Sequence, residues 1–551
     1  MQDVYERLMT LAKRRGFIHP SFEIYGGIAG FYDYGPLGAQ LKHNIEEIWR
    51  FFYIIKEGCL EVNTPTITLY EVLEASGHVE EFTDLTIDCN QCRRSYKVED
   101  IIGKDQTVDQ ALKEGNIKCP NCKKKLSNPY HTNLMFSTKI GVGEGRRAFL
   151  RPETAQGIFT NFHLLYRYAR EKLPFGVVQI GRGYRNEISP RQGVIRQREF
   201  SMAEAEIFFD PLDKTHPRFN SIKKTKVTLL DDENKESRIS LGEAVDKKLI
   251  NNQALAYYMY LTQEFLITCG VDKNKFRFRK HKKNELAHYA TECWDAELYS
   301  ERFGWVECVG IADRSAYDIN AHIKSSGVDM YATRRYDTPK VIKTRRVVVR
   351  MDNLGPLFKN NASKVKNILE EVKPDQIKEP LVVNIDGKDI EVPKNCYDIV
   401  ESTESAAGEK FIPHVIEPSY GIDRIIYFVL EHNYRVERRN NEDYHILGLK
   451  PCIAPIKTGV FPLVNEDSLI KLAEDVDHLL RDAGVVTYYD DTGSIGRRYA
   501  RMDEIGTPFC ITIDHESLKD NCVTIRDRDS TRQERVKIKD LVSIINSRLH
   551  I

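Results

Sequence analysis

Apolar residues recur at helical or strand spacing along most of the chain, in segments separated by polar stretches. Residues 41–58 carry apolar side chains on one helical face, and Gly58 should end that helix. These side chains are Leu41, Ile45, Ile48, Phe52 and Ile55. Residues 59–67 then alternate like a strand, and Pro65 favours an edge or irregular strand. The pattern predicts a helix followed by such a strand.

The last hundred residues follow a different pattern, in which strand-like and helix-like segments alternate. Residues 467–484 form the clearest amphipathic helix, which lies between two strand-like segments. Its predicted apolar face consists of Leu469, Leu472, Ala473, Val476, Leu479 and Leu480. This alternation is typical of a small α/β domain with parallel strand pairing. The sequence therefore predicts an α/β (α+β) protein with two domains, 1–440 and 441–551.

Three polar, highly charged stretches interrupt the first domain and are interpreted as insertions. They cover about 89–130, 211–290 and 341–410. The second contains the run KFRFRKHKK at 275–283, in which aromatic and basic residues alternate. Such a run is typical of an RNA-backbone contact or of a solvated charged face.

Composition narrows the class of protein. Lysine plus arginine and aspartate plus glutamate both number 81, which excludes a globally basic nucleic-acid coat but permits a local basic face. With 41% hydrophobic and 29% charged residues, the chain should fold as a globular protein. No apolar run approaches the ~18 residues of a membrane span, and the N-terminus has no signal-peptide core. We expect a cytoplasmic protein with no membrane contact.

Four of the twelve cysteines form two CxxC pairs, Cys89 with Cys92 and Cys119 with Cys122. A reducing compartment disfavours disulfides, and two such pairs can close a tetrahedral zinc site. The 26 residues between the pairs exceed the usual gap of about 15–20. The sequence leaves a structural zinc ion and a metal-free loop of reduced thiols as alternatives.

Arginines are concentrated in the predicted hairpin GYRNEISPRQGVIRQREF, residues 183–200. Arg185 and Glu187 share one strand face, and Arg191, Arg196 and Arg198 follow. Arginine forks bind phosphate, although a solvated charged hairpin has the same composition. Arg424, on the first turn of an apolar helix that follows Gly421, could bind a nucleotide phosphate or form a structural salt bridge.

Together these segments resemble class II aminoacyl-tRNA synthetases. The hairpin 183–200 is similar to their motif 2, GIDRIIYFVL to motif 3, and residues 41–58 with Pro65 to motif 1 at the dimer interface. The phrases IYGGIAGFYDYGPLGAQLKHNI, LRPETAQGIF, RNEISPRQGVIRQREF, MAEAE, ADRSAYD and EPSYGIDR are similar to the homodimeric glycyl-tRNA synthetases. The resemblance covers almost the whole chain and thins in the three insertions.

The resemblance implies an antiparallel-sheet catalytic domain that binds ATP and Mg²⁺. Arg185 would hold the α-phosphate and Arg424 the γ-phosphate, which makes them the catalytic pair, and Glu307 would hold Mg²⁺. The full implied ATP-binding set is Arg185, Asn186, Glu187, Arg196, Gln197, Glu307, Cys308 and Arg424. The family usually has an aliphatic residue where Cys308 stands, so Cys308 should make only a backbone contact.

The resemblance also implies a glycine site, in which Arg314 would face the carboxylate of the amino acid. Its members would be Glu153, Glu204, Arg314, Glu417, Pro418 and Ser419. Glycine has no side chain to recognise, so a pocket can bind only its ammonium and carboxylate and must exclude anything larger by close packing. Alternatively, Glu153 could cap the following helix and Glu204 could be an ordinary exposed helix residue.

The implied reaction joins ATP and glycine to glycyl-adenylate and then transfers glycine to the 3′ end of tRNA(Gly). The tail from about 441 is similar to an anticodon-binding domain, where Arg497, Arg498 and Arg501 would contact RNA or form a solvated basic helix. One alternative is a catalytically inactive relative that binds nucleic acid, but Arg185, Glu187 and Arg424 are present. A synthetase for proline, histidine or threonine is another, and Glu153, Glu204 and Glu417 argue against it.

Overall fold

The computed structural model divides the chain into two compact units, residues 331–411 and the remainder. It describes residues 3–549 except 103–107, 109, 111–116, 189, 191–192, 288, 373–376, 378–379, 386–387 and 440–441. Arg191, one of the arginines expected in motif 2, lies outside the described residues.

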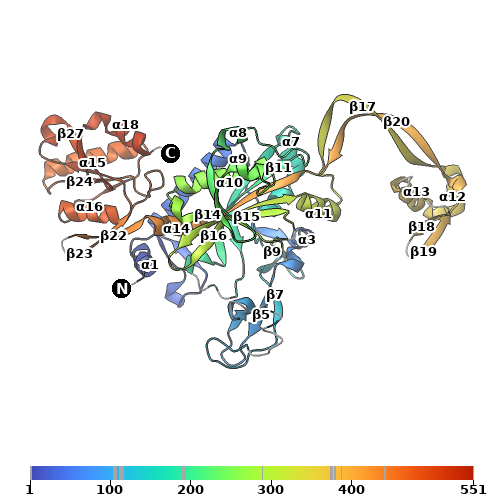
Figure 1. Ribbon diagram of the computed structural model, residues 1–551, viewed down its shortest axis with the longest axis horizontal. Coiled ribbons are helices and arrows are strands. Elements are labelled where there is room, and N and C mark those ends of the chain that lie inside the picture. The colour runs from blue at the N-terminus through green and yellow to red at the C-terminus, as the bar shows by residue number, and fades with distance from the viewer. Residues whose placement is uncertain are drawn as a thin grey trace. The chain divides into compact units, whose positions relative to one another are not determined.

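The larger unit is built on a nine-stranded sheet, in the order β13-β12-β14-β15-β16-β21-β11-β10-β3 (Figure 1). These strands are β3 Leu60–Glu61, β10 Phe175–Tyr184, β11 Glu199–Phe209, β12 Lys226–Leu230, β13 Glu236–Ser240, β14 Phe276–Lys280, β15 Glu292–Ser300, β16 Gly304–Ser315 and β21 His414–Gly421. All neighbours are antiparallel except β12 with β14 and β3 with β10. This confirms the expected antiparallel catalytic sheet. Of the strand expected over 59–67 only β3 forms in this sheet, at its edge, and Pro65 lies outside β3.

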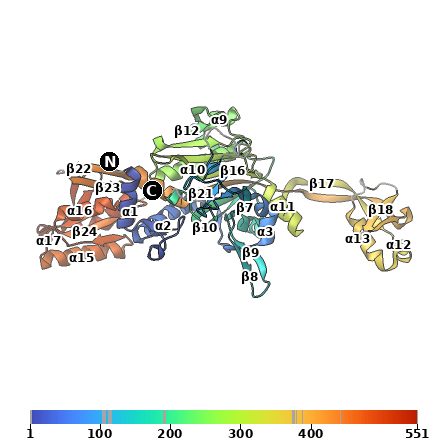
Figure 2. The same cartoon turned by 90° about the horizontal axis from the view of Figure 1, so that it is seen from below.

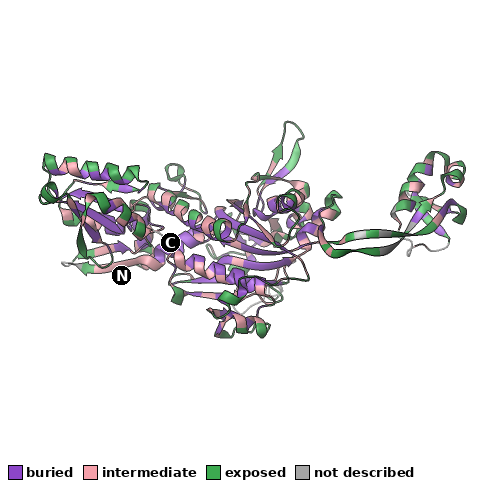
Figure 3. Ribbon diagram, turned by 90° about the horizontal axis from the view of Figure 1, so that it is seen from above, coloured by how far each residue is buried: buried purple, intermediate pink, exposed green. Residues whose placement is uncertain are grey.

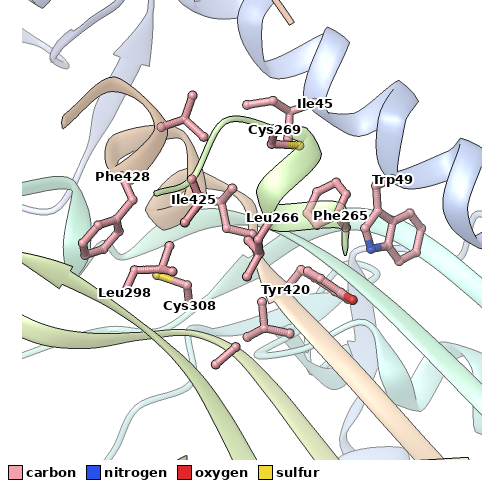
Figure 4. Packing of buried hydrophobic residues seen from close by; sticks show 14 of the residues in the cluster. Ile45, Trp49, Phe265, Leu266, Cys269, Leu298, Cys308, Tyr420, Ile425 and Phe428 are labelled. Carbon is pink, nitrogen blue, oxygen red and sulfur yellow. The ribbon is translucent and has the colours of Figure 1, made fainter. Parts of the chain in front are cut away.

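Three helical segments cover one face of the sheet and bury the main core there (Figures 3 and 4). They are α2 Pro36–Arg50, which continues as a π-helical turn Phe51–Lys56, α10 Gln253–Thr268 and α14 Ile422–Asn433. The hydroxyl of Tyr420, on β21, lies 2.8 Å from those of Tyr53 and Thr262. Tyr53 and Thr262 belong to the helical layer, so these contacts join the layer to the sheet.

The π-helical turn changes which side chains of the predicted helix are buried. Leu41, Ile45, Ile48 and Phe52 are buried as expected, but Ile55 is 71% exposed. A π turn places an extra residue in one turn, so the apolar stripe rotates and Tyr53 enters the core. The prediction for Ile55 was wrong because helical periodicity assumes a constant 3.6 residues per turn.

Smaller elements complete the catalytic half, among them the β8–β9 hairpin labelled in Figure 2. The helices are α1 Val4–Arg14, α3 Tyr70–Ala75, α4 His78–Glu81, α6 Ala155–Phe159, α7 Phe162–Tyr168, α8 Phe219–Ile222, α9 Leu241–Asp246 and α11 Tyr317–Ser326. The strands are β1 Ile18–Pro20, β2 Tyr32–Tyr34, β4 Ile67–Leu69, β8 Ser137–Ile140 and β9 Arg146–Leu150. A separate three-stranded sheet, β6 Ser95–Lys97, β5 Thr83–Asp88 and β7 Tyr130–Asn133, carries the CxxC pairs.

The charged segment 211–290 contributes β12, β13 and β14 to the central sheet rather than forming a separate unit. The run 275–283 lies on β14, where Phe276 and Phe278 point into the core. Arg277 and Arg279 both bind Glu297, at 2.8 and 3.0 Å. The run is therefore largely a sheet strand, and Arg277 and Arg279 are paired with acidic residues of β15.

Residues 331–411 form a long two-stranded ribbon and a small domain with its own core. The ribbon consists of β17 Ala332–Val349 and β20 Tyr397–Phe411. The small domain consists of α12 Met351–Phe358, α13 Ala362–Glu371, β18 Leu381–Ile385 and β19 Lys388–Val392. This unit includes the stretch 341–410 interpreted as the third insertion.

The C-terminal part holds a five-stranded sheet, in the order β25-β24-β26-β27-β28. Its elements are β24 Thr458–Pro462, α15 Asp467–Asp482, β25 Thr487–Tyr489, α16 Ile495–Glu504, β26 Phe509–Ile513, α17 Ser517–Asp520, β27 Cys522–Asp527, β28 Gln533–Lys537 and α18 Ile538–Leu549. Strand β24 pairs in parallel with β25 and β26, as predicted. On α15, Leu469, Ala473, Val476 and Leu480 are buried and Leu472 packs against them, but Leu479 is 38% exposed.

The two predicted domains are joined without a break in packing. The hairpin of β22 Tyr434–Arg439 and β23 Glu442–Leu447 crosses the expected boundary at 440/441. Leu447, Leu449, Ile453 and Phe461 belong to the same buried cluster as the core of the central sheet. Among the described residues, no helix is long and apolar enough to cross a membrane.

Candidate active site

Residues of motifs 2 and 3 line a pocket at the ends of β10, β11 and β16. Seven of the eight residues expected to bind ATP line it: Arg185, Glu187, Arg196, Gln197, Glu307, Cys308 and Arg424. Asn186 does not line it. The Asn186 side chain is exposed, and its backbone N–H donates to the carbonyl of Leu134 at 2.7 Å. We call this cavity the arginine pocket.

Arg185 is held in the arginine pocket by aromatic rings and a carbonyl. Its guanidinium carbon lies 5.3 Å from the ring centroids of both Phe82 and Phe200. Its Nε is 3.4 Å from the Pro152 carbonyl. Within the described part of the chain, no carboxylate lies within ion-pair distance of Arg185. Its charge is therefore available to an anion such as phosphate.

Arg424 enters the same pocket from the first turn of α14. Its Nε donates to the carbonyl of Ile195 at 2.9 Å, and its Nη1 donates to the carbonyl of Glu307 at 2.7 Å. The Glu307 carboxylate lies 3.8 Å from Arg424 Nη1, and its side chain is 53% exposed, so a cation could reach it beside Arg424. The Cys308 side chain is 2% exposed and belongs to the hydrophobic core (Figure 4), and burial raises the pKa of its thiol. This placement agrees with the expectation that Cys308 contributes only backbone.

Beside the arginine pocket, the face of the sheet opposite the helical layer carries buried carboxylates. Glu204 and Glu417, on β11 and β21, are 1% and 5% exposed. Ser419 Oγ donates to Glu204 at 2.8 Å and also lines the arginine pocket, so the two regions adjoin. Pro418 is buried between Glu417 and Ser419, and strand alternation turns its ring to the opposite face.

Glu153 and Glu204 are both anchored by the segment that starts α6. The backbone N–H of Thr154 donates to Glu204 at 2.7 Å. Glu153 accepts from Gln156 Nε2 at 3.0 Å, and the imidazole of His78 lies 3.5 Å from its carboxylate. Glu204 is thus a buried strand residue rather than an exposed helix residue. Glu153 binds side chains of the cluster, although its contact with Gln156 is local.

Arg314 has a different environment from the one expected. Its Nη1 donates to Glu417 at 2.6 Å, its other guanidinium nitrogens donate to Asp318 at 2.8 and 2.9 Å, and Glu153 lies 3.8 Å away. The Tyr289 ring stacks on it at 3.8 Å. In this structure Arg314 neutralises the protein's own carboxylates, so the carboxylate of a ligand would have to compete with them.

Sequence inspection missed Glu206, Asp318, Gln156, His78 and Tyr289. The signal for Glu206 was present, because it stands two residues after Glu204 on one strand and therefore shares its face. Glu206 is fully buried, and neither of its carboxylate oxygens has a hydrogen-bond partner among the described residues. Burial, reinforced by Glu417, raises the pKa of Glu206 well above its usual range. No sequence pattern pointed to the other four residues.

The charges of this acidic cluster do not balance. Five carboxylates, those of Glu153, Glu204, Glu206, Asp318 and Glu417, face two guanidinium groups, Arg314 beside most of them and Arg151 near Glu204. Burial and the nearby glutamates raise the pKa of Glu417 to about 8, against the lowering effect of Arg314. Burial and Glu153 also raise the pKa of Glu204, whereas His78 and Arg314 outweigh burial and lower the pKa of Glu153. A small cation placed here would relieve the repulsion.

The four paired cysteines converge at the end of the β5–β6–β7 sheet. Cys89 and Cys122 sulfurs are 3.5 Å apart, Cys92 and Cys119 sulfurs 3.6 Å, and all four lie within 4.8 Å of one another. The backbone N–H of Cys122 is 3.5 Å from the Cys119 sulfur. Four thiols at this spacing fit a tetrahedral zinc site.

Comparison with known proteins agrees with this architecture. Residues 137–433 match the class II tRNA synthetase core domain (G, H, P, S and T), and 452–548 match an anticodon-binding domain. A solved prolyl-tRNA synthetase from Cryptosporidium parvum, complexed with L-proline and AMP, shares the fold. Its TM-score is 0.51 at 13% identity, over 98% of this chain and 77% of that one. The fold is that of a class II tRNA synthetase.

Full-length relatives narrow the assignment. The glycine–tRNA ligase of Methanocaldococcus jannaschii is 49% identical over 100% of this chain and 99% of its own length. Those of Archaeoglobus fulgidus and Methanothrix thermoacetophila are 47% and 46% identical, each over 98% of this chain and 96% of its own. The chain belongs to the glycine–tRNA ligase family.

Proposed function

We propose that the protein activates glycine with ATP to glycyl-adenylate and then transfers glycine to the 3′ end of tRNA(Gly). The observation that carries the proposal is the acidic cluster beside the arginine pocket. Its excess of buried carboxylates suits a small cation, and the adjoining arginines suit a polyphosphate. The ammonium of glycine would balance the charge of the acidic cluster, and close packing around it would exclude an amino acid with a side chain.

In this mechanism the protein mainly positions charges. The glycine carboxylate attacks the α-phosphate in line, and the bond to the β-phosphate breaks so that pyrophosphate leaves. Arg185 holds the α-phosphate and Arg424 the γ-phosphate end. Glu187, Arg196 and Gln197 line the remaining nucleotide space. Class II enzymes use Mg²⁺, which would neutralise developing phosphate charge, and Glu307 would hold it. Glu153, Glu204, Glu417 and Ser419 hold the ammonium.

The proposal is tested by ATP–pyrophosphate exchange with a panel of amino acids. Glycine should support exchange and alanine, serine and proline should not. If proline, histidine or threonine supported exchange and glycine did not, that amino acid would be the substrate instead of glycine. No exchange with any amino acid, together with nucleic-acid binding, would favour the inactive accessory relative.

We also propose that the four cysteines hold one structural zinc ion. The small sheet around them has few buried residues, and a tetrahedral ion would stabilise it directly. Elemental analysis should find about one equivalent of zinc per chain, and Cys119→Ser should release it. Metal-free protein with a normally folded β5–β6–β7 sheet would contradict this proposal.

We propose that residues from about 441 bind the anticodon region of the tRNA. Of the three arginines considered, Arg498 is buried, donating to the Asp491 and Gly493 carbonyls, and Arg501 pairs with Asp490. Arg497 is exposed and is the best RNA contact of the three. Arg497→Ala should raise the KM for tRNA in charging without changing ATP–pyrophosphate exchange, and equal losses in both assays would contradict this role.

Finally, we propose a cytoplasmic homodimer. Several apolar side chains in the first 60 residues are exposed in the single chain, including Ile24 at 89%, Tyr25 at 86% and Ile55 at 71%. Covering such side chains is a common driving force for association. Light scattering should give twice the mass of the chain, and a monomer at micromolar concentration would exclude the dimer.

A further inference from the structure

The stem of the cysteine-bearing sheet ends at the arginine pocket. We call residues 83–133, from the start of β5 to the end of β7, the cysteine module. Phe82 directly precedes β5, and Leu134 directly follows β7. The backbone N–H of Leu134 donates to the carbonyl of Phe82 at 3.1 Å, so the two ends of the module are fastened together.

Both of these end residues contact motif 2. The Phe82 ring lies 5.3 Å from the guanidinium of Arg185. The Leu134 carbonyl accepts the backbone N–H of Asn186 at 2.7 Å. Consecutive motif 2 residues are therefore held by the two ends of the module, one through a side chain and one through the backbone.

A third contact comes from inside the module. Asp100, on the 3-10 turn Val98–Asp100 after β6, lies 3.5 Å from Arg196 on the other side of the motif 2 loop. The same turn contributes Val98, which is fully buried in the module core. The position of Asp100 thus depends on that core.

The core formed by the described residues of the module is small and includes two of the cysteines. Its buried members are Ile87, Cys89, Tyr96, Val98, Cys119 and Leu126. A core of this size usually needs a metal or disulfides to persist. Strand β5 spans about 20 Å between Phe82 and Cys89, so order at the cysteines can be transmitted along paired strands to the arginine pocket.

We propose that the cysteine module is a positioning element for the ATP site, in which Phe82 orients Arg185 and Leu134 fixes the backbone of Asn186. The proposal rests on the proposed function for the identity of the ligand. Phe82 and Leu134 act through motif 2 and touch no reacting atom. An intact module therefore sets the affinity for ATP more than the affinity for glycine.

The contact through Phe82 is tested by two variants that both keep an apolar side chain. Phe82→Leu removes the aromatic face, and Phe82→Tyr retains it. We expect Phe82→Leu to raise the Kd for ATP, measured by calorimetry without amino acid, by about 3- to 30-fold. The KM for glycine should change less than about twofold, and Phe82→Tyr should restore the wild-type Kd. Equal rises in both constants for Phe82→Leu would mean a general packing role and would overturn the assignment.

The module as a whole is tested by Cys119→Ser, with Cys522→Ser as the matched control outside the module. We expect Cys119→Ser to weaken ATP binding at least as much as Phe82→Leu and to accelerate hydrogen exchange at the Asn186 amide, whereas Cys522→Ser should do neither. Unchanged ATP binding in a Cys119→Ser protein whose module has lost protection would overturn the inference.

The two proposals fail in different ways. Wild-type protein that supports no glycine-dependent exchange would end the proposed function, yet its ATP binding would still report on the module. Wild-type exchange with glycine, together with normal ATP binding by both Phe82→Leu and Cys119→Ser, would leave the function standing and remove the positioning role.

Discussion

Arg185 and Arg314 lie in adjoining parts of one site, yet their surroundings are opposite. Arg185 is held by the Phe82 and Phe200 rings and a carbonyl, with no described carboxylate within ion-pair distance. Arg314 is fully buried and binds Asp318 and Glu417, with Glu153 close by. The charge of Arg185 is therefore available to an anionic ligand, whereas the charge of Arg314 is paired with carboxylates of the protein.

The difference shows how one site can bind an anion and a cation side by side. Aromatic rings and carbonyls hold the guanidinium of Arg185 without neutralising it, so this part of the arginine pocket can attract an anion. In the acidic cluster one guanidinium serves several carboxylates, which lets them be buried together but leaves the cluster negative. Ser419 donates to Glu204 and also lines the arginine pocket, so the two regions share this residue.

The largest expected effect tests the arginine pocket. Arg185→Ala should lower kcat/KM for glycine-dependent exchange by about 10²–10³-fold, because a preorganised charge at the α-phosphate is lost. The control is Arg238→Ala, which removes an equal charge from an exposed position on β13. Near-normal exchange by folded Arg185→Ala protein would detach the arginine pocket from catalysis.

The next largest expected effect tests the acidic cluster. Glu417→Ala should raise the KM for glycine about 30-fold, because the ammonium and Arg314 both lose a partner. It also opens space, so the preference for glycine over alanine in kcat/KM should narrow. Above pH 8, where Glu417 is ionised, Glu417→Gln, which keeps the volume, should raise the KM without narrowing that preference. An unchanged KM and preference in Glu417→Ala would remove Glu417 from glycine recognition.

The two halves should also differ in their response to pH. The pKa of Glu417 is raised to about 8, so in the free enzyme this carboxyl is protonated below that pH and attracts an ammonium only above it. We expect kcat/KM for glycine to fall up to about tenfold per pH unit below pH 8. The KM for ATP should stay level, since guanidinium groups do not titrate in this range. Glu417→Gln should flatten the glycine profile, and a wild-type profile already flat from pH 6 to 8 would contradict the assigned charge.

The smallest expected effect is a difference in the KM for glycine between variants of Glu204 and Glu206, which lie on the same strand. Glu206 has a strongly raised pKa and should be neutral already, so Glu206→Gln should change the KM for glycine less than about twofold. Glu204 accepts hydrogen bonds from Thr154 and Ser419, and Glu204→Gln should disrupt them and raise the KM clearly more. Similar effects of the two substitutions would show that Glu206 carries charge at neutral pH.

Much of the fold followed from the sequence, and the misses have physical causes. Strand alternation and helical spacing gave the β21–α14 segment, the edge position of β3 and the parallel strands at the C-terminus. Ile55 was misplaced because a π turn breaks the assumed periodicity. For the run 275–283 the sequence left an RNA contact and a solvated charged face open, and neither anticipated a sheet strand, because the acidic partners Glu297 and Asp295 are distant in sequence.

The candidate site divides in the same way. Residues within a motif could be found from the sequence. Arg185 belongs to a residue type that binds phosphate, and Glu187 lies beside it in motif 2. Tyr289 and His78 could not be found, since they support the site through tertiary contacts that leave no local pattern. Glu153 and Glu417 were expected in the site together with Arg314, but their pairing with Arg314 was not, because burial decides whether a charge pairs with the protein or stays available to a ligand.

The shared buried cluster around Leu447 and Phe461 has a consequence for how the molecule melts. The C-terminal sheet has a buried cluster of its own, but it also shares the main core through these residues, so we expect it to unfold with the central sheet in one calorimetric transition. The unit 331–411, with a separate core, is free to unfold on its own. Heating should therefore divide the chain at its ribbon insertion rather than at the junction between its catalytic and tRNA-binding parts.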